Sequence, residues 1–279
     1  MASQSASALD EAPGGCDDAS MPAIIPIGAF SDNYIWLLRK GAHAVVVDPG
    51  DAEPVLACLA REELLLAGIL NTQHHGDHVG GNVELLRRFD VPVYGPARES
   101  IPGRTHPLRA GDSVRLDALG ITLAVLDVPG HTAGHIAYVG EAAGVPVAFV
   151  GDTLFAGGCG RLFEGSPADM LASLARLAAL PGSTQIYCAH EYTLANLRYA
   201  LAVEPGNAVL AARQAVEQAK RDQGEPTVPS TLDLELATNP FLRVAIPEVA
   251  AAARVRAGRA LGSPVDVFAV LREWKNVFR

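Results

Sequence analysis

A dense group of metal-binding side-chain types lies in the segment from Asn71 to Gly81, which reads NTQHHGDHVGG. Its three histidines and one aspartate stand at positions 74, 75, 77 and 78, directly after the apolar run Leu64 to Leu70. Such a cluster is costly to bury unless its groups are paired or hold a metal ion. Because open α/β folds bind their ligands at strand ends, this position favours a functional site over a solvated polar turn.

Three further residues of metal-ligand type follow later runs that are predicted to be strands. His131 lies in a polar turn, Asp152 follows the run Val145 to Val150, and His190 follows Gln185 to Cys188. A single histidine after a strand is more often an ordinary core or surface residue, so each position alone is weak evidence. Because strand ends converge on one edge of a sheet sandwich, the four positions together predict one site.

The chemistry of these groups suits metal ions. Imidazoles and carboxylates are ligands for zinc or iron, and a shared carboxylate suits a pair of ions. Two ions about 3.5–4 Å apart can hold a bridging hydroxide as the nucleophile and polarise a carbonyl group at neutral pH. The sequence contains no GxSxG nucleophile elbow, no GxGxxG fingerprint and no Walker A loop. Metal-assisted hydrolysis is therefore the reaction class that the residues support by themselves.

Patterns of apolar residues indicate the elements that position these groups. Strands are predicted at 23–27, 33–38, 44–48, 68–71, 91–94, 114–116, 121–128, 135–139, 145–150 and 185–188. We expect the strands from 91 to 128 to belong to a second sheet. Helices are predicted at 52–63, 82–89 and 166–180, the last with Ser166 as N-cap and Pro167 in its first turn. Beyond residue 190 we expect no strands, only helices near 194–203, 207–222, 247–261 and 264–277.

The composition is that of a globular chain, with 279 residues of which 49% are hydrophobic and 19% are charged. No apolar run has the length of a transmembrane helix, so we expect no membrane partner. The net charge of −9 argues against a general nucleic-acid binder. Residues 239–279 nevertheless hold seven Arg or Lys against three acidic residues. This basic end indicates an anionic small molecule or, equally, a solvated helical face.

The cysteines and the N-terminus bear on location and on domain organisation. Four cysteines, at 16, 58, 159 and 188, form no CxxC pair, which is typical of reduced thiols in a cytoplasmic protein. Residues 1–20 lack the apolar core of a signal peptide. We expect a disordered extension at 1–21, an α/β catalytic domain at 22–192 and a helical domain at 193–279. We also expect a monomer.

Several motifs of this chain resemble those of a known superfamily and, within it, one family. The His/Asp cluster, Pro-Gly-His131, Gly-Asp152-Thr and His190 resemble the metallo-β-lactamase superfamily, whose αββα sandwich carries a dinuclear metal site. The resemblance to glyoxalase II, the hydroxyacylglutathione hydrolases, is more specific. It lies in GDTLF (151–155), GCGRLFEG (158–165), CAHEYT (188–193), EPTVPSTL (225–232), NPFLR (239–243) and LREWK (271–275). The resemblance covers about residues 22–279.

This resemblance implies a role for each matching metal ligand. Metal site one would take His75 and His131, and site two would take Asp77, His78 and His190. Asp152 would bridge two divalent metal ions, in the first place zinc, with iron or manganese as alternatives. Asp77 and Asp152 would be the catalytic residues, because they hold the metals. A hydroxide bound between the two metals would attack the thioester carbonyl of S-D-lactoylglutathione. The products would be glutathione and D-lactate, in the second step of methylglyoxal detoxification.

The resemblance also implies a substrate-binding set in a C-terminal glutathione-binding domain. Arg161, Arg272 and Lys275 would hold the carboxylates of glutathione, and Tyr192 would hydrogen-bond its peptide. The spacing agrees at one point, because Arg272 and Lys275 lie three residues apart on a predicted helix and therefore share a face. An ordinary basic surface stripe would have the same spacing.

Gln73 departs from the family pattern. The family cluster reads His-x-His-x-Asp-His, and its first histidine, a ligand of site one, falls on Gln73 here. A neutral amide oxygen is a weaker donor to zinc than an imidazole. The neighbouring His74 is expected to point away from the direction shared by positions 73 and 75. We therefore predict an intact site two and a weakened site one that depends on Gln73 or on a water molecule.

Two alternatives remain open at this point. The first is another enzyme of the superfamily, such as a lactonase, a β-lactamase or a persulfide dioxygenase. The dioxygenase uses the position of Gln73 as an iron ligand, so this residue counts against it, as does the C-terminal motif set. The second is a metal-poor pseudoenzyme that binds glutathione conjugates without hydrolysing them, a reading that Gln73 motivates.

Overall fold

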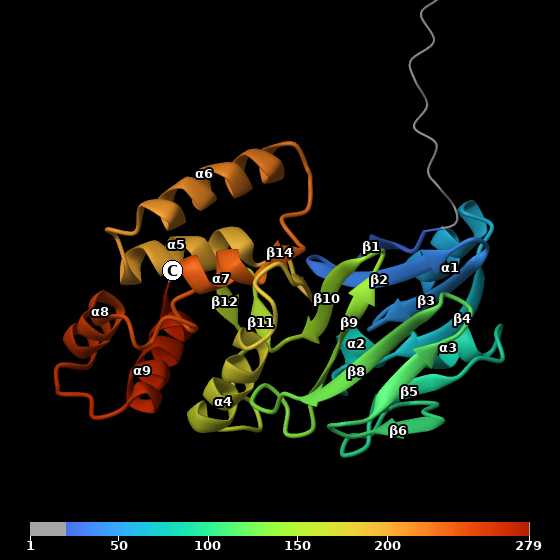
Figure 1. The fold of residues 1–279 in the computed structure, drawn as a ribbon, viewed down its shortest axis with the longest axis horizontal. Helices are drawn as coiled ribbons and strands as arrows, with labels where there is room; N and C mark the ends of the chain where they lie inside the picture. Colours follow the sequence, from blue (N-terminus) through green and yellow to red (C-terminus); the bar gives the residue numbers. More distant parts are fainter. Residues whose placement is uncertain (1–20, 279) are drawn as a thin grey trace, which may run out of the picture.

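The computed structural model describes residues 21–278, whose strands form two six-stranded sheets and one two-stranded hairpin (Figure 1). The first sheet has the order β1 (Ala23–Ala29), β2 (Asn33–Lys40), β3 (His43–Val47), β4 (Leu65–Leu70), β5 (Val93–Pro96) and β6 (His106–Leu108). The second has the order β14 (Ser230–Thr231), β13 (Gln185–Cys188), β10 (Val145–Gly151), β9 (Ile136–Ala142), β8 (Ile121–Asp127) and β7 (Ser113–Leu116). The predicted disorder at 1–21 falls almost entirely outside the described residues.

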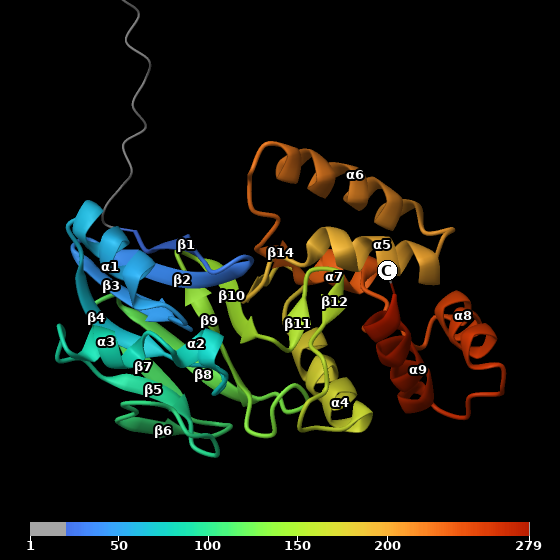
Figure 2. The same cartoon turned by 180° about the vertical axis from the view of Figure 1, so that it is seen from behind.

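The alternation of side chains along β2 explains how the layers pack. Trp36 and Leu38 point into the core shared with the second sheet, where they belong to the same cluster as Val125 and Phe149. Ile35 and Leu37 face the other way and pack against two helices, α1 (Ala52–Arg61) and α3 (Asn82–Leu86), which cover the first sheet (Figure 2). Because successive strand residues point to opposite faces, one apolar run supplies both cores.

The second sheet is covered by α4 (Pro167–Ala178), which buries Met170, Leu174 and Leu177 in the same core. Ser166 and Asp169 form a capping box at the start of this helix, so its predicted N-cap is confirmed. With helices on the outside of both sheets, the predicted αββα sandwich is confirmed.

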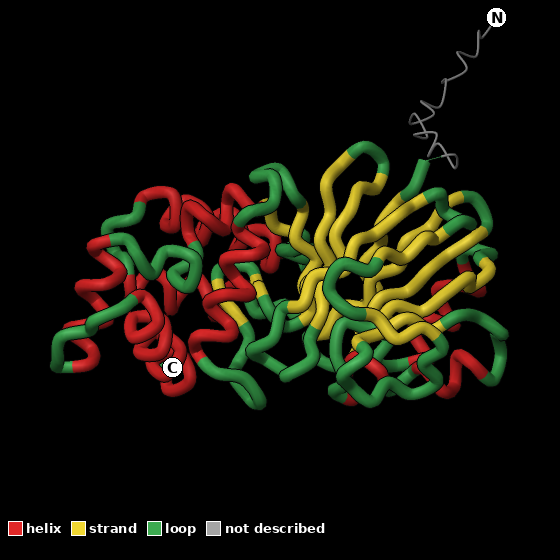
Figure 3. The backbone as a smooth tube through the Cα atoms, turned by 60° about the horizontal axis from the view of Figure 1, so that its bottom comes forward, coloured by secondary structure: helices red, strands yellow, loops and turns green. Residues whose placement is uncertain are grey.

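The C-terminal part of the chain is helical, and its helices gather on one side of the strands (Figure 3). They are α5 (Thr193–Val203), α6 (Ala208–Asp222), α7 (Leu232–Thr238), α8 (Pro247–Ala257) and α9 (Pro264–Val277). None of the helices between residues 21 and 278 combines the length and the apolar character needed to cross a membrane. The domain boundary at 192–193 stays a prediction, since α5 begins there but β14 of the helical part pairs with β13.

Two expectations about strands were wrong. The strand predicted at 91–94 lies in the first sheet, where β5 pairs in parallel with β4 through Ile69 and Val93. The chain between β4 and β5 forms α2 (Gly76–Val79) and α3, and a helical crossover of this kind returns the chain parallel to the strand it left. The absence of strands beyond residue 190 was also wrong, because Ile186 pairs with Ser230.

Candidate metal centre

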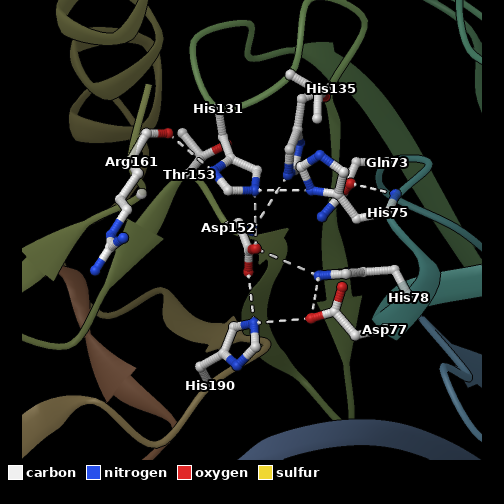
Figure 4. A network of polar contacts seen from close by, with 12 residues as sticks. Gln73, His75, Asp77, His78, His131, His135, Asp152, Thr153, Arg161 and His190 are labelled. Atoms are coloured by element: carbon white, nitrogen blue, oxygen red, sulfur yellow. Dashed lines mark hydrogen bonds and ion pairs between the residues drawn. The ribbon is translucent and has the colours of Figure 1, made fainter. Parts of the chain in front are cut away.

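Loops that follow four strand ends meet at one edge of the sandwich (Figure 4). The strands and the side chains that follow them are β4 with His75, Asp77 and His78, β8 with His131, β10 with Asp152, and β13 with His190. The structure thus brings together all six histidine and aspartate residues that the sequence placed in the metal centre.

Asp152 occupies the middle of the centre. Its Oδ2 atom lies 3.3 Å from Nε2 of His78 and 3.1 Å from Nε2 of His131, and its Oδ1 lies 3.4 Å from Nε2 of His190. Burial alone would raise the pKa of this carboxyl, but His78 and hydrogen bonds from the histidines hold the pKa well below its usual range. Its backbone N–H donates to Nε2 of the buried His135, which itself lies outside the cluster. A charged, central carboxylate can serve two metal positions.

Asp77, His78 and His190 form one half of the centre. Each places a possible ligand atom within 4.8 Å of the other two. Oδ2 of Asp77 lies 3.4 Å from Nε2 of His190 and 3.7 Å from Nε2 of His78, and it accepts a hydrogen bond from Asn33. Two imidazoles and a carboxylate, with Asp152 beside them, are a suitable donor set for zinc.

Carboxylates and a carbonyl behind the histidines select which ring nitrogen faces the centre. Nδ1 of His78 lies 3.0 Å from Oδ2 of Asp48, and Nδ1 of His190 lies 2.8 Å from Oδ1 of Asp32. Nδ1 of His131 lies 2.9 Å from the carbonyl oxygen of Arg161. Metal-binding histidines are usually oriented in this way, which leaves Nε2 as the ligand atom.

Asp48 and Asp32 were missed in the sequence, although a signal was present. Asp48 directly follows β3 in an Asp-Pro-Gly segment and adopts a positive φ of 53°. It also accepts hydrogen bonds from the backbone and the hydroxyl of Thr72, both at 2.7 Å. A Cβ atom on Gly50 would lie 1.9 Å from the carbonyl oxygen of Asp77, so only glycine allows this approach. The short segment therefore shapes the centre from behind.

The electrostatics of this half of the centre favour a cation. Burial alone would lower the pKa of His190, but hydrogen bonds to Asp152 and Asp77 outweigh burial and raise the pKa to about 10. The pKa of His78 is likewise raised, because Asp152 and Asp48 outweigh its complete burial. Carboxylates surround both imidazoles, so a positive charge is stabilised here. The residues of this half therefore fit a divalent metal ion.

The other half contains His75 and His131, whose Nδ1 and Nε2 atoms lie 3.1 Å apart. Burial lowers the pKa of His75, and the neighbouring His131 lowers it further. Gln73 is fully buried beside them, and its Oε1 accepts the backbone N–H of His75 at 2.7 Å. Its Nε2 has no hydrogen-bond partner within residues 21–278 and points toward the centre in Figure 4.

This orientation makes Gln73 a poor replacement for a histidine ligand. The amide oxygen, its only metal-binding atom, is engaged by the backbone, and the amide nitrogen is a donor without a lone pair for a metal. The half-site of His75 and His131 therefore offers two imidazoles and the shared Asp152. It fits a metal ion less well than the half-site of Asp77, His78 and His190.

His74 points away from the centre, as expected. Its Nδ1 lies 3.0 Å from Oε2 of Glu99, and its Nε2 lies 3.3 Å from Oε1 of Glu164. Both carboxylates also accept backbone N–H groups of the loop that carries His131, from Gly134 and Ala133 respectively. His74 thus connects the loop after β4 to the loop after β8.

A cavity of about 510 Å³ opens from the centre. Its lining includes His75, Asp77, His131, Asp152 and His190 at one end, aromatic rings, and the cationic residues Arg161, Arg272 and Lys275. Tyr192 also lines it and stacks on the ring of His190, with centroids 4.7 Å apart. The predicted substrate-binding residues therefore share one cavity with the predicted metal ligands.

The cationic residues differ in how free their side chains are. Nη1 of Arg272 donates to the carbonyl oxygen of Cys159 at 2.6 Å, so this buried guanidinium is partly engaged by the backbone. Burial, together with the nearby charges of Arg272, Arg198 and Arg161, lowers the pKa of Lys275 to about 8. Repulsion among these cations makes this end of the cavity favourable for an anion.

The fold and the paired His/Asp half-sites define a member of the metallo-β-lactamase superfamily, and residues 29–190 match the model of that superfamily. Residues 191–278 match the model of the hydroxyacylglutathione hydrolase C-terminus. The chain belongs to the hydroxyacylglutathione hydrolase family, as the resemblance in its sequence motifs predicted.

Relatives support the family assignment, and solved structures share the fold. The hydroxyacylglutathione hydrolase of Alkalilimnicola ehrlichii is 57% identical over 92% of this chain and 99% of its own length. That of Cupriavidus taiwanensis is 55% identical over 93% and 100%. The BLEG-1 B3 metallo-β-lactamase is 26% identical, with a TM-score of 0.58 over 80% of this chain and 99% of that one. ETHE1 from Myxococcus xanthus, at 23% identity, shares the fold, with a TM-score of 0.60 over 91% of this chain and 98% of that one.

Proposed function

We propose that this chain hydrolyses the thioester S-D-lactoylglutathione to glutathione and D-lactate, the second step of methylglyoxal detoxification. The observation that carries the proposal is the single cavity that joins the His/Asp centre to Arg161, Arg272 and Lys275. A thioester of glutathione has its reacting carbonyl at one end and carboxylates at the other. The His/Asp end of the cavity suits the reacting carbonyl, and the cationic end suits the carboxylates.

The residues of the centre have separable tasks in this reaction. Asp77, His78 and His190, together with Asp152, hold a divalent metal ion, for which zinc is the first choice. When bound, the metal supplies Lewis-acid chemistry that activates water and polarises a carbonyl group. We propose that the half-site of His75 and His131 has a lower affinity for a metal ion, because Gln73 offers it no free oxygen.

The remaining residues of the cavity bind and orient the substrate. Lys275 and Arg161 attract its carboxylates, and Arg272 adds positive charge from the cavity wall. The ring of Phe155 packs edge-on against His190, and that of Phe163 packs edge-on against His131, so apolar surface borders the reacting end. Phe155 is buried, so its ring keeps water from one side of the reacting end and strengthens the electrostatic interactions there.

The C-terminal family match and the named relatives favour a glutathione thioester over a β-lactam, a lactone or a persulfide. We also propose a monomer in the cytoplasm, with residues 22–192 as the catalytic domain and 193–279 as the glutathione-binding domain. The three buried free cysteines at 58, 159 and 188 support a reducing location.

Release of free thiol from S-D-lactoylglutathione by the zinc-loaded protein tests the proposal. We expect turnover with this thioester, and none after the metal is removed by a chelator. A lactone, a β-lactam and a persulfide serve as matched comparison substrates. Binding of the glutathione thioester without thiol release, in a fully loaded sample, would support the pseudoenzyme instead.

A further inference from the structure

A second group of metal-binding side chains lies beside the metal centre. His74, His75 and Glu164 each place one possible ligand atom within 4.8 Å of the others, and we call these three residues the outer cluster. Nε2 of His74 lies 3.3 Å from Oε1 of Glu164. Glu164 is exposed, whereas the two histidines are half-buried, so an ion can reach the cluster from solvent.

Glu99 orients His74 as carboxylates orient metal-binding histidines. Its Oε2 lies 3.0 Å from Nδ1 of His74, and the residue is only 7% exposed. Apart from this contact, that oxygen has no polar partner in the described part of the chain. Its other oxygen accepts from the hydroxyl of Thr132 and the backbone N–H of Gly134. Because Nδ1 of His74 faces this fixed carboxylate, Nε2 is left for a ligand on the side of Glu164.

The outer cluster offers more than the half-site that Gln73 has weakened. Between His75 and His131 an incoming ion meets two imidazoles, the shared Asp152 and an amide N–H group. At the outer cluster it meets two imidazoles and a carboxylate of its own, with Glu99 behind. Two carboxylates also balance the charge of a divalent ion.

We propose that a second zinc ion binds at the outer cluster, to His74, His75 and Glu164, rather than between His75 and His131. His75 belongs to both positions, so an ion in the outer cluster draws this ring away from the half-site of His131. The inference goes beyond the hydrolase activity, because it concerns the place of a second ion and is tested by metal binding alone.

Titration of the metal-free full-length chain with zinc, followed by calorimetry, tests the proposal. We expect one tight ion and one weaker ion per chain. Glu164→Gln should weaken the second binding event at least about tenfold, because it replaces a charged ligand by a neutral one. Glu141→Gln, an exposed carboxylate on β9, is the matched control and should leave both events unchanged.

His131→Asn distinguishes the outer cluster from the half-site of His75 and His131, because His131 belongs only to the half-site. The proposal requires that this variant bind the weaker ion as the wild type does, while Glu164→Gln binds it at least about tenfold more weakly. Wild-type affinity for the weaker ion in Glu164→Gln would overturn the proposal, whatever the His131 variant does. So would a wild-type chain that takes up only one zinc ion in excess metal. Anomalous scattering from zinc-soaked crystals then locates the second ion directly.

Discussion

The side-chain oxygen of Gln73 accepts the backbone N–H of His75 at 2.7 Å, and this bond turns the amide nitrogen toward the metal centre. The nitrogen finds no hydrogen-bond partner in the described chain. Rotating the amide by half a turn would free the oxygen but place two donors against each other. The bond to His75 therefore fixes the asymmetry between the two half-sites.

Replacement of Gln73 by histidine should restore the weaker half-site. The half-site would then hold three imidazoles and Asp152, so we expect the second zinc ion to bind about 10–100-fold more tightly. Calorimetric zinc titration measures the change. Gln73→Leu removes the amide without adding a ligand and is the control. Equal zinc affinity in the histidine and leucine variants would show that position 73 does not limit metal binding.

Loss of the carboxylate behind His78 should weaken the tight half-site. In Asp48→Asn, Nδ1 of His78 no longer faces a negative charge, so zinc affinity should fall about 10–100-fold. The dissociation constant, measured by competition with a chelator, reports the effect. Asp90→Asn, at an exposed position, should leave zinc affinity as in the wild type. Unchanged zinc affinity in Asp48→Asn would show that Asp48 does not support the metal site.

Substrate capture should depend on the charge of Lys275. With a pKa of about 8, its ammonium group is charged below that pH and neutral above it. We therefore expect kcat/KM to fall as pH rises through 8, by up to about tenfold at pH 9. In Lys275→Arg the guanidinium stays charged, so the fall should flatten. An identical pH profile in both proteins would contradict a role for this charge.

The same pKa has a consequence for stability. Burial holds it below the ordinary value of 10.5, so the unfolded chain binds more protons than the folded chain between about pH 8 and 10.5. The contribution of Lys275 to the free energy of unfolding must therefore rise with pH across this window. Denaturant unfolding of wild type and Lys275→Met at pH 8 and pH 10 checks the sign. Relative to Lys275→Met, the free energy of unfolding of the wild type should rise from pH 8 to pH 10.

A buried ion pair inside the helical part also contacts the hairpin that precedes Arg161. Glu235 is fully buried, accepts from Arg213 at 2.6 Å and also accepts the backbone N–H of Gly157 in the hairpin that precedes Arg161. Glu235→Ala leaves the guanidinium unpaired and should lower the free energy of unfolding by about 3–5 kcal/mol. Glu84→Ala, which breaks only the solvent-exposed pairs with Arg87 and Arg88, should cost less than about 1 kcal/mol. Urea unfolding measures both, and similar small losses would refute the role of Glu235.

The convergence of the His/Asp side chains could be predicted because they follow the ends of strands. His131, Asp152 and His190 each follow an apolar run that stops sharply, and strand ends meet at a sheet edge whatever their separation in sequence. Asp48 and Asp32 satisfy the same rule. They were missed because only the fold shows the histidine that each of these carboxylates faces.

The sequence also could not predict which distant strands pair with each other. The run at 91–94 reads as a strand, but nothing in those residues states which sheet it joins. Similarly, β14 is two residues long, too short for a period to be recognised, and exists because Ser230 and Thr231 add to the edge of β13. Such choices depend on tertiary contacts that local propensity does not encode.

Zinc content per chain, measured on the same sample as hydrolysis of S-D-lactoylglutathione, tests whether the His/Asp centre is catalytic. We predict that the protein is inactive after a chelator has removed its metal. One tightly bound zinc ion per chain should restore thiol release, and we expect it at Asp77, His78, Asp152 and His190. Absence of turnover in a fully loaded sample would contradict the claim that this centre is catalytic. Two zinc ions of equal, tight affinity would contradict the asymmetry that Gln73 imposes.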